Sequence, residues 1–497
     1  MNLLLPKRYI ILMLVILGDK NIIAANVSDS IYFKLELDDT SKFQKPGKII
    51  VEYMTDHSRF FYFQEKKVFE FYLNHGKEVN FAVPHNQIFS YFIIRYYSPD
   101  GAVAIPFHGD KWYLVMHEEE VHATISMGGI FFKGKYAAYF NCQRDIQDLY
   151  KPLPRHVLLT RQKKQDEYLL GLKEYKDSVY LQQKLILEKH QQLFNDTAFK
   201  IIDLSCRAKA YFNVLYEMRY NRQGRWNAAR QIVNEYLGPR DLSSDLLVSV
   251  PYYCDYLLLR EYMNISYNNE RAVEARFHYT KTYDSINTYY SGLLREKLIC
   301  LFYLYDTRLK GLISDRLSHS FSIVRSPRYG TMLKQISTSI LTGIPAYPFE
   351  LEDTTGQVIK LSDFKNKLLV LDFWFKGCKP CMDLAKAMIP IKEKYKDDTN
   401  VVFININVDE DKTKWISALS NGIYSSAKNE FNLYTNGYGI YHPFIKYYNF
   451  FGFPHQIVVD REGKVAVIDP PRPISEENKI LFIQLIESHL RQISLQP

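Results

Sequence analysis

Cys378 and Cys381 are the residues of this sequence whose type and spacing best suit them to chemistry. Cysteine thiolates attack disulfides and also bind metal ions, so the C-x-x-C pattern alone is typical of redox sites and of zinc sites. Lys379 and Pro380 stand between the two cysteines, in the segment 375–381 (FKGCKPC). The elements that flank the pattern therefore have to indicate which chemistry applies.

A buried strand and a helix are predicted to meet at the cysteines. Leu368–Trp374 (LLVLDFW) is an almost continuous apolar run, and the sequence from Cys381 onward (CMDLAKAMIPIKEKY) has helical spacing, with a kink expected at Pro390. A second apolar run, Val401–Val408 (VVFININV), follows. Strand, helix and strand in this order predict a right-handed parallel βαβ unit.

The rest of the C-terminal third shows further strand and turn signals. We expect strands at Phe349–Leu351, Gln456–Asp460 and Val465–Ile468, a hairpin turn at 461–464 (REGK), and a closing helix at Glu476–Arg491. Phe453-Pro454 directly precedes the second of these strands.

The strand-to-helix junction predicts a reactive thiolate at Cys378. A helix N-terminus favours an anion, and Lys379 adds a nearby cation. Pro380 is tolerated in the first helical turn and restricts the loop. Cys381 lies one turn further on, so we expect it to be the more buried cysteine and to resolve a mixed disulfide formed at Cys378.

The segment Ile344–Pro497 resembles the TlpA/ResA-like branch of the thioredoxin superfamily. The resemblance rests on the opening PAYPFELEDTTGQVIKLSDFKNK, the strand LLVLDFW, the motif CKPC and the segment FPHQIVVDREGK. Gly377 departs from the pattern, because many thioredoxins have Trp there. The two preceding zones resemble more loosely the β-rich and helical regions that precede this domain in some exported bacterial homologues.

The resemblance implies roles for Pro454, Trp374 and Asp372, and His455 is a further candidate because it follows Pro454. Pro454 matches the cis-proline beside the motif, and Trp374 matches the aromatic residue next to it. Asp372 matches a buried acid that assists deprotonation of the second cysteine, and the alternative is a strand-end carboxylate bound to backbone. His455 either lies near the sulfurs or is a surface histidine.

Two zones precede this domain. From about Ile31 to Phe140, five alternating segments separated by turn residues predict an antiparallel β-sandwich or small barrel. They are Ile31–Leu37, Lys48–Met54, Lys66–Leu73, Phe89–Tyr97 and Trp112–His117. From about Gln143 to Ser337 the spacing becomes helical, as in Lys163–Phe194 and Arg225–Leu237, and we expect six or more helices.

The N-terminus has the composition of a secretory signal. Lys7 and Arg8 precede the apolar run Tyr9–Gly18, and Ala24-Ala25 offers a small-residue cleavage site. The run is shorter than the ~20 apolar residues of a spanning helix, and the alternative is an uncleaved anchor. We therefore expect an exported protein, soluble or peripheral in the periplasm or cell envelope.

Composition excludes several classes of protein. The chain has 497 residues with 47% hydrophobic and 24% charged, which excludes a disordered or a disulfide-stapled mini-protein. Its net charge of +8 is small for this length, and the basic cluster 161–164 is followed by Asp166 and Glu167, so we expect no nucleic-acid partner.

Other candidate sites have the wrong spacing. The histidines of the segment 117–122 (HEEEVH) are one position too far apart to share a helical face, so we expect no metal site and no cofactor. Phosphate-loop and nucleophile-elbow motifs do not occur in the sequence. Four scattered cysteines either pair, in three possible connectivities, or remain buried free thiols; they are Cys142, Cys206, Cys254 and Cys300.

Together these features predict an exported thiol–disulfide oxidoreductase with four parts: a signal peptide (1–25), a β-rich domain (26–142), an all-α domain (143–337) and an α/β thioredoxin-like domain (338–497). The direction expected from the resemblance is reduction of disulfides in envelope proteins, fed by an upstream electron donor. An oxidase or isomerase on the same site, and a partner-binding protein with a redox-sensitive module, are the alternatives. The substrate, the donor, the oligomeric state and the purpose of the first two domains stay open.

Overall fold

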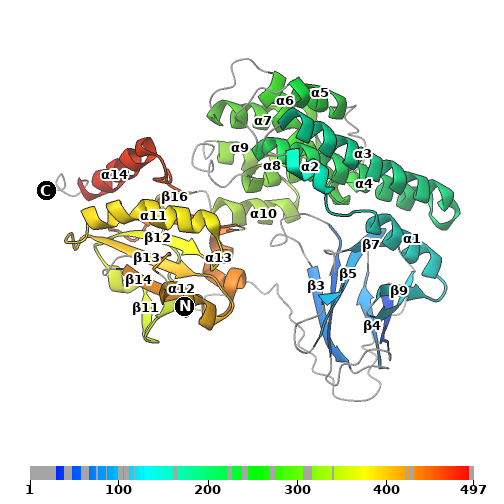
Figure 1. Cartoon of the computed structure of the whole chain (residues 1–497), viewed down its shortest axis with the longest axis horizontal. Helices are drawn as coiled ribbons and strands as arrows, with labels where there is room; N and C mark the ends of the chain where they lie inside the picture. Colours follow the sequence, from blue (N-terminus) through cyan, green and yellow to red (C-terminus); the bar gives the residue numbers. More distant parts are fainter. Residues whose placement is uncertain are drawn as a thin grey trace. The chain divides into compact units, whose positions relative to one another are not determined.

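The computed structural model describes eighteen ranges of the chain (Figure 1). They are residues 30–38, 47–56, 66–73, 77–85, 87–98, 104–105, 111–116, 119–126, 128–160, 165–220, 227–237, 245–268, 275–305, 316–338, 341–420, 422–424, 430–450 and 452–491. The predicted signal sequence, the basic cluster 161–164 and most of the predicted turns of the β-rich zone lie outside the described residues. The chain divides into two compact units, residues 1–272 with 284–298 and residues 273–283 with 299–497.

The N-terminal region is β-rich and contains two sheets. The first has the strand order β4-β1-β8-β9, and the second has the order β3-β2-β5-β6, with β7 also paired to β5. Phe33 of β1 stacks on Phe81 of β4 and makes an edge contact with Phe92 of β5, so aromatic rings fill the space between the sheets. The strands are β1 (Ser30–Leu37), β2 (Gly47–Met54), β3 (Lys66–Leu73), β4 (Glu78–Pro84), β5 (Phe89–Tyr97), β6 (Ala104–Ile105), β7 (Trp112–Met116), β8 (Glu120–Ser126) and β9 (Gly129–Lys133).

The prediction that this sandwich is purely antiparallel is wrong. β1 pairs with β8 in parallel, with Phe33 opposite Val121. The reason is connectivity: the strands of the second sheet intervene between β1 and β8, so the chain returns to the first sheet through a crossover and not through a hairpin.

Helices occupy the middle of the chain, as predicted, but they begin earlier than residue 143. Helix α1 starts at Ala137, so the predicted boundary after residue 142 falls inside it. Gln143 on α1 donates to the Leu114 carbonyl and accepts from the Leu114 amide, which fastens α1 to the edge strand β7. The helices are α1 (Ala137–Asp148), α2 (Arg155–Thr160), α3 (Gln165–Lys189), α4 (Asp196–Tyr220), α5 (Asn227–Tyr236), α6 (Tyr253–Asn268), α7 (Ala275–Tyr289), α8 (Gly292–Tyr305), α9 (Leu317–Ile323) and α10 (Pro327–Ser337).

The C-terminal region contains a seven-stranded mixed sheet with the order β11-β10-β14-β13-β12-β15-β16. β12 and β13 run in parallel, as do β13 and β14, and the remaining pairs are antiparallel. The strands are β10 (Glu350–Asp353), β11 (Val358–Lys360), β12 (Leu368–Trp374), β13 (Val401–Asn407), β14 (Glu430–Tyr434), β15 (His455–Val459) and β16 (Val465–Ile468), and the helices are α11 (Lys379–Lys394), α12 (Lys412–Ser420), α13 (Pro443–Tyr448) and α14 (Glu476–Arg491).

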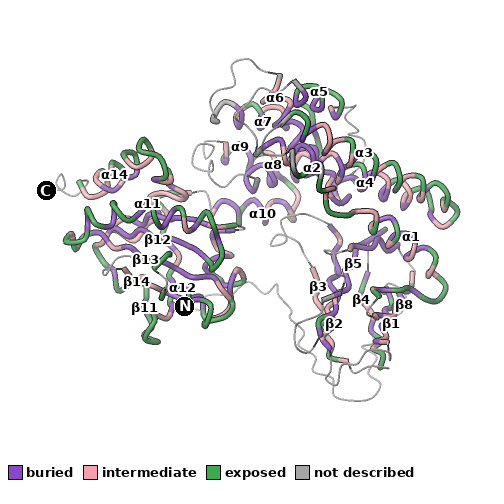
Figure 2. The backbone as a smooth tube through the Cα atoms, viewed as in Figure 1, coloured by how far each residue is buried: buried purple, intermediate pink, exposed green. Residues whose placement is uncertain are grey.

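The central strand β12 is buried along its whole length (Figure 2). Leu368 and Val370 pack against residues of α11 and α14, whereas Leu369, Leu371 and Phe373 face the other core, which includes residues of α13. An apolar run without alternation is what a strand covered on both faces requires. The predicted kink at Pro390 does not end α11, which continues through it to Lys394.

Candidate active site

Cys378 and Cys381 lie where β12 leads into α11. β12 ends at Trp374, and Cys378 is the residue that caps α11, whose first residue is Lys379. The two sulfurs form a disulfide, and the Cys381 amide points at the Cys378 sulfur at 3.2 Å. Pro380 occupies the first helical turn, where its missing N–H costs no hydrogen bond. The free amides of a helix N-terminus point toward a sulfur at this position. They stabilise the Cys378 thiolate when the disulfide opens.

The two cysteines are buried to nearly the same degree, with 4% of Cys378 and 3% of Cys381 exposed. Cys381 is thus the more buried cysteine, as expected, but by only a small margin. Cys378 is covered because its sulfur lies 3.7 Å from the Phe453 carbonyl oxygen and because it belongs to the same apolar cluster as Cys381 and Trp374.

Pro454 stands beside the disulfide. The Phe453–Pro454 peptide bond is cis, and β15 begins at the next residue. Arg472, which follows β16, donates a hydrogen bond of 2.7 Å to the Pro454 carbonyl. Arg472 therefore stabilises the Phe453–Pro454 segment that faces the Cys378 sulfur. Nothing in the sequence marked this arginine as part of the site.

His455 is buried, and the surface alternative for it is wrong. Its Nδ1 lies 2.8 Å from both carboxylate oxygens of Asp469, and its ring stacks on Phe450 with centroids 4.0 Å apart. Both side chains of this contact are almost fully buried. Asp469 reaches His455 because β15 and β16 form an antiparallel pair, which brings residues 14 positions apart in sequence together.

Asp372 lies on β12 between two neighbouring strands. It is paired in register with Asn405 of β13 and Gln456 of β15, and it is buried. Burial raises the pKa of Asp372 to about 7, although the nearby charges of Lys392 and Arg472 act in the opposite direction. Its Oδ1 makes no hydrogen bond to the described residues, so the structure gives no support to the backbone-bound alternative.

A buried ion pair stands near Asp372. Lys392 of α11 binds Glu430 of β14 at 2.8 Å, and both side chains are at most 4% exposed. Asn405 also donates to the Glu430 carboxylate. In sequence, Lys392 is one of several lysines of an amphipathic helix, and nothing local marked it as buried.

Trp374 belongs to an aromatic cluster that packs with the two cysteines. Its ring stacks on Tyr424 with centroids 4.4 Å apart, and Trp415 stacks on Tyr434 at 4.9 Å. All four rings are grouped with the two cysteines in one apolar cluster. Tyr424 has no local sequence signal, because its contact with this site spans 47 residues.

Lys379 points to solvent and forms an ion pair with Asp383 one turn along α11. Its charge is therefore partly neutralised, and less of its field reaches Cys378 than the sequence suggested.

The other candidate sites do not assemble among the described residues. No group of three or more His, Cys, Asp or Glu side chains that could hold a metal ion occurs in this part of the chain. His117 and Glu118 lie outside it, and His122 in β8 binds Glu36. The cysteines outside the C-x-x-C motif are free and buried, which agrees with the free-thiol alternative; they are Cys142, Cys206, Cys254 and Cys300.

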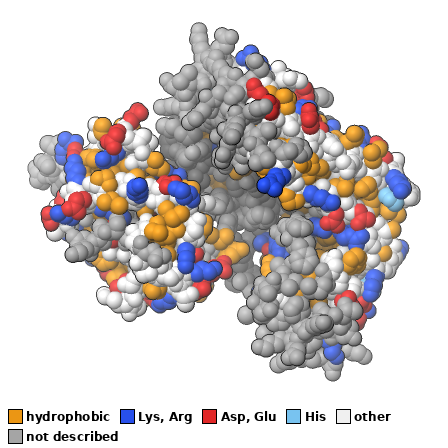
Figure 3. Space-filling model, viewed as in Figure 1, with side chains coloured by type: hydrophobic (Ala, Val, Ile, Leu, Met, Phe, Trp, Pro, Cys, Tyr) orange, Lys and Arg blue, Asp and Glu red, His pale blue; other side chains and the backbone are white. Residues whose placement is uncertain are grey.

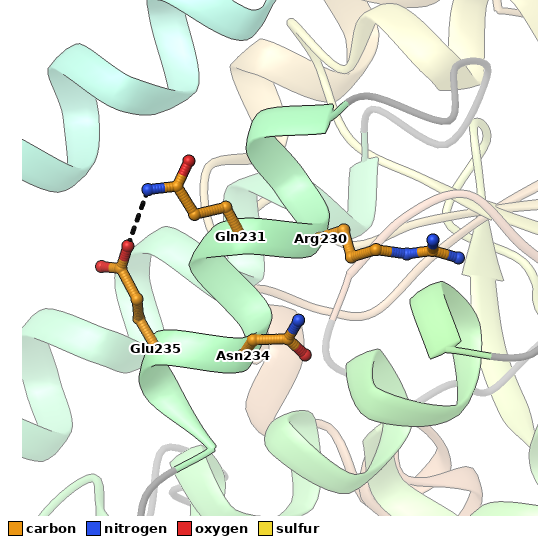
Figure 4. A pocket seen from close by; sticks show the side chains of 4 residues that line it. All are labelled: Arg230, Gln231, Asn234 and Glu235. Carbon is orange, nitrogen blue, oxygen red and sulfur yellow. Dashed lines mark hydrogen bonds between the residues drawn. The ribbon is translucent and has the colours of Figure 1, made fainter.

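A pocket of about 590 Å³ lies on the helical region, lined by Arg230, Gln231, Asn234 and Glu235 of α5 (Figure 4). Gln231 donates to Glu235 within it. None of these four lining side chains carries a thiol. In the ranges that the structure covers, every helix is too short or too polar to cross a membrane.

Comparison with known proteins identifies the C-terminal region. The profile of the AhpC/TSA family matches residues 342–468. Residues 342–468 form a thioredoxin-like domain. Its curated relatives include the thioredoxin-like protein YneN of Bacillus subtilis, 33% identical over 92 residues (18% of this chain, 54% of the relative). The thiol-disulfide oxidoreductase ResA of the same organism is 39% identical over 74 residues (15% and 41%).

ResA of Bacillus thuringiensis is similar over a longer stretch, with 28% identity over 160 residues, 31% of this chain and 78% of the relative. The chain spans about half the length of the first two relatives. Among solved structures, a thiol:disulfide interchange protein from a Bacteroides species is 25% identical, with a TM-score of 0.25, and covers 29% of this chain and 92% of its own. In sequence, the thioredoxin-like domain is similar to the two ResA proteins, which are thiol-disulfide oxidoreductases.

Proposed function

We propose that this protein is an exported thiol–disulfide oxidoreductase that reduces disulfides of cell-envelope proteins through Cys378 and Cys381. The observation that carries the proposal is the disulfide at the junction of β12 and α11, where the helix N-terminus stabilises a thiolate. The similarity of the domain to ResA supports the same chemistry.

The reaction conserves electrons between two dithiol–disulfide pairs. In the reduced protein, the Cys378 thiolate attacks one sulfur of a substrate disulfide; that S–S bond breaks, a mixed disulfide forms, and the other substrate sulfur leaves as a thiolate. Cys381 loses its proton and attacks the Cys378 sulfur, which releases the second substrate thiolate. The substrate gains two electrons, and the protein is left with the Cys378–Cys381 disulfide. A dithiol donor then reduces this disulfide by the same exchange.

Other groups have supporting roles in this proposal. Asp372, buried on the strand that leads to the motif, accepts the proton of Cys381, because a carboxyl with a pKa of about 7 exchanges protons near neutral pH. Pro454 and the Phe453 carbonyl form the wall that faces Cys378. Trp374 packs in the same apolar cluster as Cys378 and Cys381 and supports the loop that precedes Cys378.

The partners in this proposal are protein disulfides and an envelope dithiol donor. The four parts of this proposal are a signal (1–25), a β-rich domain, a helical domain and a thioredoxin-like domain (338–497), with the boundary predicted after residue 142 moved to the start of α1 at Ala137. On the face of the thioredoxin-like domain that Figure 3 shows, basic and acidic side chains are interspersed, which suits protein partners better than nucleic acid. N-terminal sequencing of the protein recovered from the periplasm tests both export and cleavage after residue 25.

The first experiment is the reduction potential of the full chain in dithiothreitol or glutathione buffers, read by thiol alkylation. A value near about −270 mV makes the protein a reductase, and a value near about −120 mV makes it an oxidant. Cys378→Ser should abolish exchange, Cys381→Ser should trap the mixed disulfide, and Cys142→Ser, which changes a buried thiol outside the motif, should leave exchange unchanged. A pair that does not cycle would leave the alternative of a partner-binding protein.

A further inference from the structure

The loop between β12 and Cys378 is held by two side chains from distant parts of the domain. The Lys376 amide donates to Asp409 at 2.9 Å, and the Gly377 amide donates to the hydroxyl of Tyr424 at 2.7 Å. Asp409 follows β13, and Tyr424 follows α12. Two successive amides immediately before Cys378 are therefore anchored by groups that lie outside the loop.

Tyr424 makes a second contact with the same segment. Its ring is stacked on Trp374, with the two planes only 13° apart. The side chain is 6% exposed and belongs to the apolar cluster that contains both cysteines. One residue thus fixes the end of β12 through its ring and the residue before Cys378 through its hydroxyl.

Gly377, whose amide binds Tyr424, has a backbone conformation that favours glycine. Its φ of +91° is a backbone conformation that residues with a side chain rarely adopt, although a Cβ there would meet no atom within 4 Å. Conformation, not space, therefore favours glycine at 377. Tyr424 comes from a different part of the chain and covers Trp374 with its ring.

We propose that Tyr424 is a positioning residue that sets the redox equilibrium of the Cys378–Cys381 pair; this inference rests on the proposed function. The Cys381 amide lies 3.2 Å from the Cys378 sulfur and becomes its hydrogen-bond donor once the disulfide opens to a thiolate. The Cys381 amide stabilises the thiolate only if the loop that precedes Cys378 keeps this sulfur in place. Because Tyr424 anchors that loop, removing its hydroxyl destabilises the thiolate and hence the reduced protein relative to the disulfide.

The test is an equilibrium of the full chain with dithiothreitol. The protein disulfide accepts two electrons and two protons and becomes a dithiol, while dithiothreitol loses them and closes to its cyclic disulfide. Tyr424→Phe keeps the stacked ring but removes the acceptor for the Gly377 amide. We expect the equilibrium constant for reduction to fall about tenfold, which equals about 30 mV toward more negative potential. Iodoacetamide should also alkylate the reduced variant more slowly, with its pH profile moved to higher pH.

Tyr438→Phe is the matched control, because Tyr438 is a tyrosine of the same domain with 61% of its surface exposed. It should leave both the equilibrium constant and the alkylation profile unchanged. A merely structural role of Tyr424 would lower the melting temperature without moving either quantity, and that outcome would overturn the inference.

Amide hydrogen exchange of the unmodified protein provides a measurement that does not depend on how the variant folds. The Gly377 amide should be protected in the oxidised protein, since it donates to a buried hydroxyl. Rapid exchange at Gly377 refutes the anchor. If the wild-type pair cycles but Tyr424→Phe behaves identically, this inference alone fails; if the wild-type pair does not cycle, the proposed function fails with it.

Discussion

Replacement of Asp372 by asparagine should change how the stability of the thioredoxin-like domain depends on pH. Burial raises the pKa of Asp372 to about 7 in the folded protein, whereas an unfolded chain has an aspartate pKa of about 3.9. Between these two values the unfolded state is ionised and the folded state holds the proton. The unfolded state therefore binds fewer protons, and the free energy of unfolding falls as pH rises.

The size of this effect follows from the two pKa values. Well below pH 4 both states are protonated and the penalty vanishes, and well above pH 7 it reaches its full value of about 4 kcal/mol. Between pH 5 and pH 8 the wild-type protein should lose about 2.5 kcal/mol of unfolding free energy through this one group. Asp372→Asn has no proton to lose and should not show this loss, so its stability relative to wild type should rise with pH.

Hydrogen exchange of the β12 and β13 amides, followed in the oxidised full chain from pH 5 to pH 8, measures the free energy of opening of this sheet. The oxidised protein is used because its motif cysteines do not titrate. Asp383→Asn is the control, because Asp383 is an exposed partner of Lys379 and should give the wild-type slope. Equal slopes for Asp372→Asn and wild type would show that Asp372 is ionised at pH 5, and the argument from burial would be refuted.

Three further outcomes are expected. Lys392→Met leaves the Glu430 carboxylate buried without its cation and should lower the free energy of unfolding by about 3–5 kcal/mol in urea titrations, whereas Lys394→Met, at an exposed pair, should change it little. An unchanged urea midpoint for Lys392→Met would contradict the buried pair. Gly377→Ala should cost about 1–3 kcal/mol by thermal melting, because alanine is strained at a φ of +91°, and Gly452→Ala, without that constraint, should melt like wild type. A thiol reagent should label none of the cysteines of the folded oxidised protein and four after denaturation; fast labelling of the native protein would contradict their burial.

The strands with continuous or clearly alternating apolar patterns could be predicted from the sequence. Leu368–Trp374 was predicted with its observed bounds, because a strand covered on both faces leaves an uninterrupted apolar run. Strand β8 was missed, although Val121, Ala123 and Ile125 alternate as buried residues along it. The segment 117–122 overlaps the start of β8 and looks like a metal motif, which masks the period-2 pattern of buried residues in the strand.

Some residues of the site could be predicted from their neighbours in sequence, and others could not. Cys378 and Cys381 were recognisable because the motif and its flanking elements are contiguous in sequence. Glu430 and Tyr424 were not, because each contacts the site only through the pairing of β13 with β14 or the packing of the segment after α12. His455 was judged by its neighbours in sequence, and its partner Asp469 becomes adjacent only when β15 and β16 pair.

The end of α10 bears on how the thioredoxin-like domain can be separated from the rest of the chain. Thr338 donates to the Tyr447 carbonyl, and Asn449, the left-handed residue that ends α13, donates to the carbonyl of Gln335. A protein cut at residue 338 would lose the carbonyl that Asn449 binds, beside the aromatic residue on which His455 stacks. A shortened protein that keeps this hydrogen bond within an intact α10 therefore begins no later than Ser326, the residue that caps the helix.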